Sequence, residues 1–189
     1  STSTTRRTIL ERAGLEVEID PPRIDEKEIK RSIHKNGLDA ATLAATLAEQ
    51  KAQSITWRHA GGLVIGADQV LECDGELFNK PDDLDTARTQ LHKLSARRHD
   101  LVSACCIIQD GECLWQAVDK AQLWMRPLGK EFIESYLCAV GNNALLGPGG
   151  YQVEQLGVQL FQRIEGNHFT ILGLPLLPLL DYLRTCGVL

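Results

Sequence analysis

The stretch that decides the fold is residues 63–71, which read Leu-Val-Ile-Gly-Ala-Asp-Gln-Val-Leu. Its length and apolar composition predict a strand with both faces covered. Side chains alternate along a strand, so Asp68 shares a face with Val64, Gly66 and Val70. A carboxylate on a covered face is costly unless it is paired, hydrogen-bonded or bound to a metal. Asp68 is therefore either a capping residue at the strand end, or a general base or metal ligand where a core strand meets a cleft.

The segment before this strand predicts a long helix that reaches about Trp57. Leu43, Leu47, Lys51 and Ile55 follow one another at a spacing of four, so they lie on one stripe of that helix. Lys51 interrupts an otherwise apolar face. It is either a lysine that extends along the apolar surface to reach water, or an ammonium aimed at an anion in the cleft.

Helices and strands alternate along the rest of the chain. Helices are predicted at 5–13, from the N-cap Asp39 to about 57, from Asp82 or Asp83 to about 94, at 130–140 and after Pro175. Strands are predicted at 15–19, 63–71, 101–108 and 113–125, with a short pair within 151–163 and a hairpin turn at Asp110-Gly111. The stretch from 23 to 37 is polar and charged. This order predicts an α/β fold, a mixed twisted sheet with flanking helices, with two lobes around one cleft.

The composition excludes several classes of protein. The 189 residues are 43% hydrophobic and 24% charged, which is typical of a globular domain rather than a disordered chain. With 25 acidic and 20 basic residues the formal charge is -5, which argues against a broad basic surface for nucleic acid. The most apolar run, 171–180, is too short to span a membrane and contains two prolines. No basic-then-apolar leader opens the sequence, so secretion is not indicated.

The six cysteines, at 73, 105, 106, 113, 138 and 186, include no Cys-x-x-Cys pair. This spacing does not predict a zinc site. We interpret them as buried thiols of a protein in the reducing cytoplasm.

Three further segments contain basic residues next to predicted turns or helix ends. Ser3 and Arg6 lie at the start of the first helix, where hydroxyls and free N–H groups can bind an anion. Lys80 precedes Pro81 on a stiff turn. Arg97 and His99 lie between a helix and a strand. Each also has a purely structural interpretation, as a capped helix end, a solvated lysine and a polar loop.

Together these segments resemble the Maf-like family of nucleoside triphosphate pyrophosphatases. The motifs include Ser-x-Ser at the start, Leu-Ala-x-x-Lys-Ala around Lys51 and Gly-Ala-Asp-Gln-Val around Asp68. The matching segments, in chain order, are 1–6, 25–26, 47–52, 66–70, 79–81, 94–99 and 163–175. Seven motifs in the family's order carry the resemblance, which covers residues 1–189 as a single domain.

The resemblance implies a metal-dependent enzyme that cleaves a nucleoside triphosphate between the α and β phosphates. Asp68 would be the general base, and Glu26 and Asp68 would hold Mg²⁺ or Mn²⁺, since hard cations prefer carboxylate and phosphate oxygen. Lys51 and Lys80 would join them in catalysis by neutralising charge on the triphosphate. The candidates for substrate binding are Ser3, Arg6, Gln69, Arg97, His99, Gln152 and Glu154. The expected partner is a nucleoside triphosphate, with no nucleic acid and no membrane, and a homodimer is left open.

Base preference is tied to the segment 146–157. Glu154 stands where relatives that prefer 7-methyl-GTP also have a glutamate, and a carboxylate can accept the N1–H and N2–H groups of guanine. The resemblance therefore favours a modified or guanine-type nucleotide, in keeping with the removal of non-standard nucleotides.

Several positions depart from the family pattern. Thr4-Thr5 replaces Pro-Arg, Leu146 replaces an acidic residue, and Ala96 replaces a glycine. The family also has a strand before the position of Ser1. The lost cation and carboxylate keep one alternative open, a catalytically impaired nucleotide-binding regulator. Another is an enzyme of the related inosine-triphosphate pyrophosphatase architecture.

Overall fold

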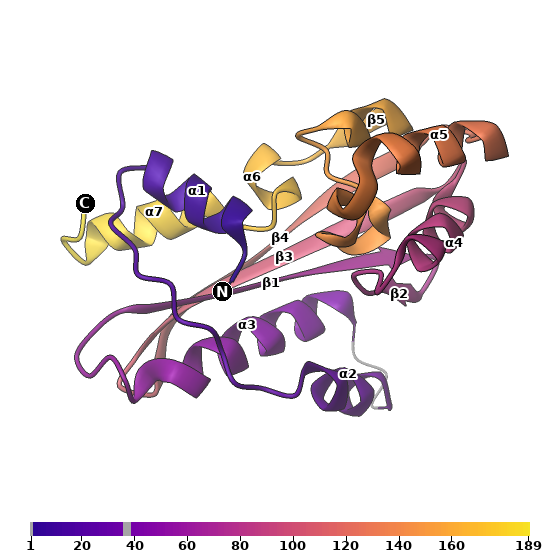
Figure 1. Ribbon diagram of the computed structural model, residues 1–189. Helices are drawn as coiled ribbons and strands as arrows, with labels where there is room; N and C mark the ends of the chain where they lie inside the picture. Colours follow the sequence, from indigo (N-terminus) through magenta and orange to yellow (C-terminus); the bar gives the residue numbers. More distant parts are fainter. Residues whose placement is uncertain (1, 36–38) are drawn as a thin grey trace. The chain divides into compact units, whose positions relative to one another are not determined.

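The computed structural model describes residues 2–35 and 39–189, without the side chains of residues 27 and 32–35. Ser1, the first residue of the 1–6 motif, lies outside the described residues. The helices are α1 (Thr4–Arg12), α2 (Glu26–Lys35), α3 (Ala40–Thr56), α4 (Leu84–Leu94), α5 (Lys130–Val140), α6 (His168–Ile171) and α7 (Leu176–Thr185), with 3₁₀ turns η1 (Gly141–Leu145), η2 (Pro148–Gly150) and η3 (Leu156–Leu160). The strands are β1 (Val64–Cys73), β2 (Glu76–Phe78), β3 (Arg98–Gln109), β4 (Glu112–Met125) and β5 (Phe161–Glu165) (Figure 1).

The strands form one sheet in the order β2-β1-β3-β4-β5. β1 pairs antiparallel with β2, with Leu71 opposite Phe78, and β4 pairs antiparallel with β5, with Leu123 opposite Ile164. Helices flank this sheet, so the predicted α/β class is confirmed. The chain separates into two compact units. The first is Ser1–Gln69, Val102–Lys120 and Asn167–Leu189; the second is Val70–Leu101 and Ala121–Gly166.

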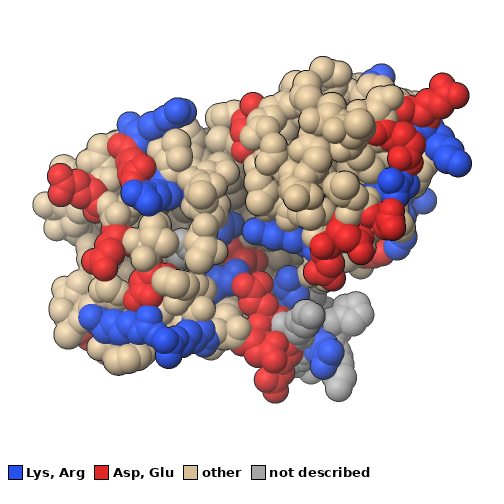
Figure 2. Space-filling model, in the orientation of Figure 1, with Lys and Arg blue, Asp and Glu red and all other residues tan. Residues whose placement is uncertain are grey.

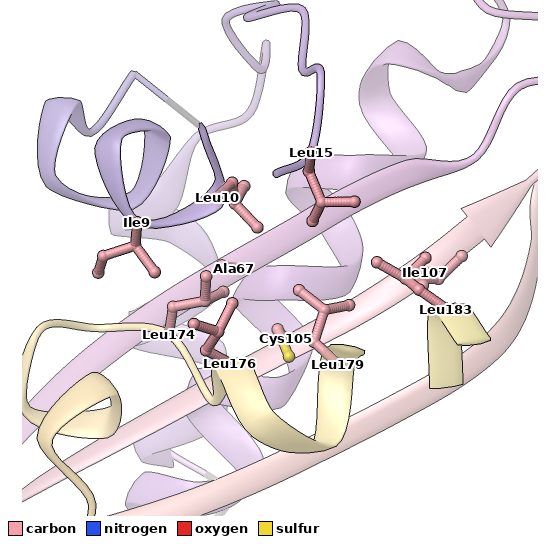
Figure 3. Close-up of a cluster of buried hydrophobic side chains, with 10 residues drawn as sticks. All are labelled: Ile9, Leu10, Leu15, Ala67, Cys105, Ile107, Leu174, Leu176, Leu179 and Leu183. Carbon is pink, nitrogen blue, oxygen red and sulfur yellow. The ribbon is translucent and has the colours of Figure 1, made fainter. Parts of the chain in front are cut away.

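In the first unit, helices cover both faces of β1 and β3. On one face, α1 and α7 pack over the strands and enclose a cluster of apolar side chains (Figure 3). Its members are Ile9, Leu10, Leu15, Ala67, Cys105, Ile107, Leu174, Leu176, Leu179 and Leu183. α3 covers the opposite face, toward which Gly66 points, since Gly66 lies against Ala48 and Ala52 of that helix. The covering of both faces predicted for residues 63–71 is therefore confirmed.

Gly66 allows α3 to lie unusually close to β1. A Cβ atom at this position would lie 2.1 Å from the carbonyl oxygen of Ala48 and 2.9 Å from the Cβ of Ala52. Only a glycine fits such an approach between two backbones. The close contact brings the side chains of α3 within reach of the next β1 residue on the same face, Asp68.

The second unit joins α4, α5 and the 3₁₀ segment to the other ends of the strands. Arg88 of α4 donates two hydrogen bonds to Glu134 of α5, at 2.6 and 3.1 Å. The Tyr136 hydroxyl donates to the carbonyl of Gly150, which ties α5 to η2. These contacts hold the loop that carries Gln152 and Glu154.

Most helix ends and one turn follow the local signals in the sequence. Asp39 caps α3 by accepting a hydrogen bond from the Thr42 N–H at 2.8 Å. Asp83, and not Asp82, caps α4 through the Thr86 N–H. The 130–140 helix has the predicted bounds. Asp110 (φ 50°) and Gly111 (φ 88°) form the predicted turn between β3 and β4.

Two strand predictions were wrong, and one helix was not predicted. Residues 15–19 form no strand, because their side chains pack onto the apolar cluster while Asp20 binds Arg58 and His59, and no strand of the sheet pairs with them. The polar stretch at 23–37 contains α2, a helix that was not predicted from its charged sequence. Within 151–163 the backbone forms η3 rather than a strand pair, and β5 begins only at Phe161.

Acidic and basic side chains both occur on the surface drawn in Figure 2. Lysine and arginine alternate with aspartate and glutamate over the face in Figure 2, without an extended basic region on that face. Within the described part of the chain, no helix is both long enough and apolar enough to cross a membrane.

Candidate active site

Lys51, Asp68 and Glu26 meet in the first unit. The Lys51 Nζ lies 2.5 Å from Asp68 Oδ1 and 2.9 Å from Glu26 Oε1. The side chains of Lys51 and Asp68 are 12% and 10% exposed, whereas that of Glu26 is 42% exposed. An ammonium group thus joins a buried carboxylate to one that reaches solvent.

Local rules explain why these three side chains converge. Asp68 points toward α3 because it shares the face of Gly66. Lys51 points toward β1 because it continues the buried stripe of Leu47 and Ile55 on α3. Glu26 begins α2, where a carboxylate interacts favourably with the helix dipole. Asp68 and Lys51 contact each other rather than a loop or bulk water, and the functional role of each stays a prediction.

Arg6 and Ser3 lie at the start of α1. The Ser3 hydroxyl accepts a hydrogen bond from the Arg6 N–H at 3.3 Å and caps the helix. The Arg6 guanidinium donates to the carbonyls of Gly173 (2.7 Å) and Ala67 (3.0 Å). Burial lowers the pKa of Arg6, while the electrostatic field of Asp68 acts in the opposite direction. The guanidinium is therefore a half-buried positive charge that is hydrogen-bonded to β1 next to Asp68.

Gln69 points to the other face of β1 and is held by its amide. Its Nε2 donates to Ser103 Oγ at 3.1 Å and to the carbonyls of Thr170 and Ile171 at 3.0 Å each. Ser103 also donates to the Thr170 carbonyl, and the Thr170 hydroxyl donates to Asp119 at 2.5 Å. These contacts anchor β1, beside Asp68, to α6.

Sequence reasoning missed Ser103, Asp119 and Thr170. Ser103 and Thr170 are fully buried. The signal was present for Ser103, a lone hydroxyl within the apolar strand 101–108, because a buried polar group needs a partner. No comparable signal marked Thr170, whose partner is 51 residues away in the chain.

The second unit carries the other predicted residues. Lys80 is exposed on the turn between β2 and α4, where the Asn79 carbonyl accepts a hydrogen bond from Gln90. Arg97 is exposed and lies 3.3 Å from Asp74. Glu154 is exposed and Gln152 is half-buried, each between η2 and η3. Ala96, at the position of the family's glycine, has a φ of 59°, the left-handed region that favours glycine.

His99 is buried rather than open to a ligand. Only 1% of the residue is exposed, and its Nε2 lies 2.7 Å from the Tyr151 hydroxyl, with the Tyr151 and Phe161 rings beside it. Among the described residues its Nδ1 has no hydrogen-bond partner. Burial lowers the pKa of His99 to about 4 from its usual 6.5, so the imidazole is neutral at neutral pH.

Glu26 and Asp68 are the groups with which this site would hold a metal. No cluster of three or more histidine, cysteine, aspartate or glutamate residues suited to a metal occurs in the described ranges. Two carboxylates fit Mg²⁺, which is commonly held by one or two carboxylates and the phosphates of a substrate. The donor set therefore fits a metal that arrives with a nucleotide rather than one held by protein ligands alone.

Comparisons with known proteins agree with the ordered motifs. A family model described as "Maf-like protein" matches residues 1–186. A nucleoside triphosphate pyrophosphatase of Nitrobacter hamburgensis is 49% identical, and the alignment covers 100% of this chain and 93% of the relative. A 7-methyl-GTP pyrophosphatase of Rhizobium etli is 44% identical over 100% of this chain and 95% of the relative. One of Mesorhizobium japonicum is 45% identical over 97% and 92%.

Proposed function

This chain belongs to the Maf-like family, and from that premise we propose that it is a nucleoside triphosphate pyrophosphatase. The proposed reaction hydrolyses the bond between the α and β phosphates and yields a nucleoside monophosphate and pyrophosphate. The names of relatives aligned over their whole length support the activity. The observation that carries it in this structure is the Lys51 ammonium between Asp68 and Glu26.

Asp68 is suited to accept a proton from water. A carboxylate on a rigid core strand is held in place, as a general base must be. In the proposed step the water oxygen bonds to the α-phosphorus, the proton passes to Asp68, and the bond to the bridging oxygen breaks. The electron pair of that bond leaves with pyrophosphate. Lys51 holds the Oδ1 of Asp68 and places positive charge where negative charge develops.

Other residues have supporting roles in the proposal. Arg6 and Gln69 position the strand around Asp68. Ser3, at the N-terminus of α1, contacts a phosphate of the substrate together with the free N–H groups of the helix. In the second unit we assign Lys80 and Arg97 to phosphate contacts, and Gln152 and Glu154 to contacts with the nucleoside. His99 was also expected to bind substrate, but its ring is buried, so we propose that it acts through Tyr151 instead.

Glu26 and Asp68 would hold a divalent cation, Mg²⁺ or Mn²⁺. When bound, such an ion supplies positive charge that polarises phosphoryl oxygens. Both carboxylates already contact Lys51, so the ammonium keeps them close together before the nucleotide arrives.

A substrate screen tests the activity directly. Common, methylated and deaminated nucleoside triphosphates are incubated with Mg²⁺, Mn²⁺ or Co²⁺, and pyrophosphate is measured separately from orthophosphate. We expect pyrophosphate and a monophosphate as the first products. Orthophosphate as the direct product contradicts cleavage at the α–β bond. Nucleotide binding without turnover across the panel would instead favour the catalytically impaired regulator, the alternative that Leu146 and Thr5 suggested.

Asp68→Asn is the matched test of the site. This change keeps the size of the side chain and removes the proton acceptor, so we expect a loss of about 100-fold or more in turnover. Asp181→Asn is the control, because Asp181 is an exposed carboxylate on α7. Pyrophosphate release by Asp68→Asn at the rate of the control would remove Asp68 from the mechanism.

We further propose a preference for a modified guanine nucleotide and a role in clearing non-standard nucleotides. Glu154 and the names of two relatives support this preference. Glu154→Gln should lower the preference for 7-methyl-GTP over dTTP with little change in maximal rate, because an amide oxygen is a weaker acceptor for the guanine N–H groups. A location in the reducing cytoplasm stays a proposal; of the six cysteines predicted to be buried, Cys73, Cys105 and Cys106 are buried, whereas Cys113, Cys138 and Cys186 are exposed.

A further inference from the structure

Within residues 2–35 and 39–189, one edge of the sheet in the first unit has no neighbouring strand along most of its length. β4 has β3 on one side and β5 on the other, but β5 pairs only with residues from Gln122 to Met125. Among the described residues, no strand pairs with 112–120 on that side. A strand edge leaves a row of backbone N–H and C=O groups that favour pairing with another strand.

The side chains of this segment, which we call the β4 edge (residues 112–120), alternate between exposed and half-buried from Leu114 to Lys120, and Cys113 before them is exposed. Trp115, Ala117 and Asp119 are half-buried, and Trp115 stacks on Tyr182 of α7 at a ring distance of 5.4 Å. The opposite face of the edge is exposed and carries Glu112, Leu114, Gln116, Val118 and Lys120. Leu114 and Val118 are 41% and 42% exposed, a high fraction for aliphatic residues on a strand.

The exposed face is complementary to itself in one register. Two copies of a strand related by a two-fold axis pair antiparallel, and directly opposite residues share a face. With the axis at Gln116, Leu114 lies opposite Val118 and Glu112 lies opposite Lys120, each pair occurring twice. Moving the axis by one residue in either direction places Leu114 opposite Lys120 or Gln116, so the apolar match and both ion pairs are lost.

We propose that the β4 edge is a dimerisation surface that pairs with the same edge of a second copy, with the axis at Gln116. Backbone hydrogen bonds extend the sheet across the two copies, while the Leu114–Val118 and Glu112–Lys120 pairs select the register. This surface includes none of Lys51, Asp68 and Glu26, and the proposal does not depend on the proposed activity.

Sedimentation velocity over a concentration series measures the association. We expect a reversible dimer. Glu112→Lys alone and Lys120→Glu alone replace both ion pairs by like charges, so each should raise the dissociation constant by about tenfold or more. Lys120→Gln, which removes the charge without creating repulsion, should have a smaller effect. Thermal unfolding of each variant at low protein concentration reports whether the monomer stays folded.

The double variant Glu112→Lys/Lys120→Glu is the decisive arm. Residues 112 and 120 are eight apart on one strand, about 26 Å, and cannot contact each other within one chain. Restored dimerisation in the double variant can therefore arise only between copies. Gln116→Cys adds a geometric test, because the two thiols would face each other across the axis at a separation that a disulfide can span. We expect it to cross-link under mild oxidation, and Val118→Cys, which faces Leu114, not to exceed the background of the native cysteines.

Three results would overturn the proposal. The first is a monomer at every concentration at which the protein is soluble. The second is a dimer that is insensitive to the single charge reversals, which assigns the interface to another surface. The third is a double variant as weakly associated as the single ones.

Discussion

The buried His99 leads to a quantitative prediction about pH. The unfolded chain binds a proton at His99 with a pKa near 6.5, whereas burial lowers the pKa in the folded protein to about 4. Because the folded value is the lower one, this neutral imidazole stabilises the fold fully above the unfolded pKa. That stability is lost as the pH falls from 6.5 toward 4, because in this range the unfolded state binds a proton at His99 and the folded state does not.

The magnitude follows from the size of the shift. One pKa unit corresponds to about 1.4 kcal/mol, so the whole effect is about 3 kcal/mol once the pH is below both values. Between about pH 7 and about pH 5 the free energy of unfolding should fall by about 2 kcal/mol through His99 alone. This is a large fraction of the stability of a typical domain.

Urea denaturation at the two pH values measures this loss, with tryptophan fluorescence and circular dichroism recorded together to check that the transition is cooperative. His99→Gln keeps a polar group beside Tyr151 but does not titrate, so we expect the variant to lose about 2 kcal/mol less than the parent over the same interval. His92→Gln is the control, because His92 is exposed on α4. If His99→Gln and the parent lose the same stability, His99 is not a buried neutral imidazole.

Three other changes test the packing and polarity around the site. Lys51→Met should lower the unfolding free energy measured by urea denaturation by about 1–3 kcal/mol and turnover by at least about 100-fold, because it leaves Asp68 and Glu26 as unpaired neighbouring carboxylates. Lys130→Met is the control at an exposed lysine. Full activity of Lys51→Met would refute the proposed role of Lys51. Gly66→Ala should lower the unfolding free energy by about 3 kcal/mol or more, since its Cβ meets the Ala48 carbonyl, while Gly129→Ala, with nothing within 4 Å, should not. Ala96→Gly should raise it by about 1 kcal/mol by relieving a left-handed φ, and a stability loss there would contradict the strain.

Local patterns correctly predicted where two residues of the candidate site lie on their elements. The alternation around Asp68 placed the carboxylate on a covered face, and the spacing of four placed Lys51 on the buried stripe of its helix. Caps such as Asp39 and the Asp110-Gly111 turn depend on residues close in sequence, so they too were readable. In contrast, the helix that begins at Glu26 was missed, although Ile29 and Ile33 have the spacing of four that is typical of one helix face.

The sequence by itself determined the strand through Asp68, the helix of Lys51, the hairpin, the family and the absence of a net basic charge. Only the tertiary structure decided that Lys51 Nζ meets both Asp68 and Glu26, that Gln69 is held by Ser103 and α6, and that His99 is enclosed by Tyr151 and Phe161. The physical reason is the separation in sequence of the residues that interact. Periodicity, capping and turn formation depend on neighbours within a few residues, whereas burial of a side chain and the partner it finds depend on segments that the folded chain brings together.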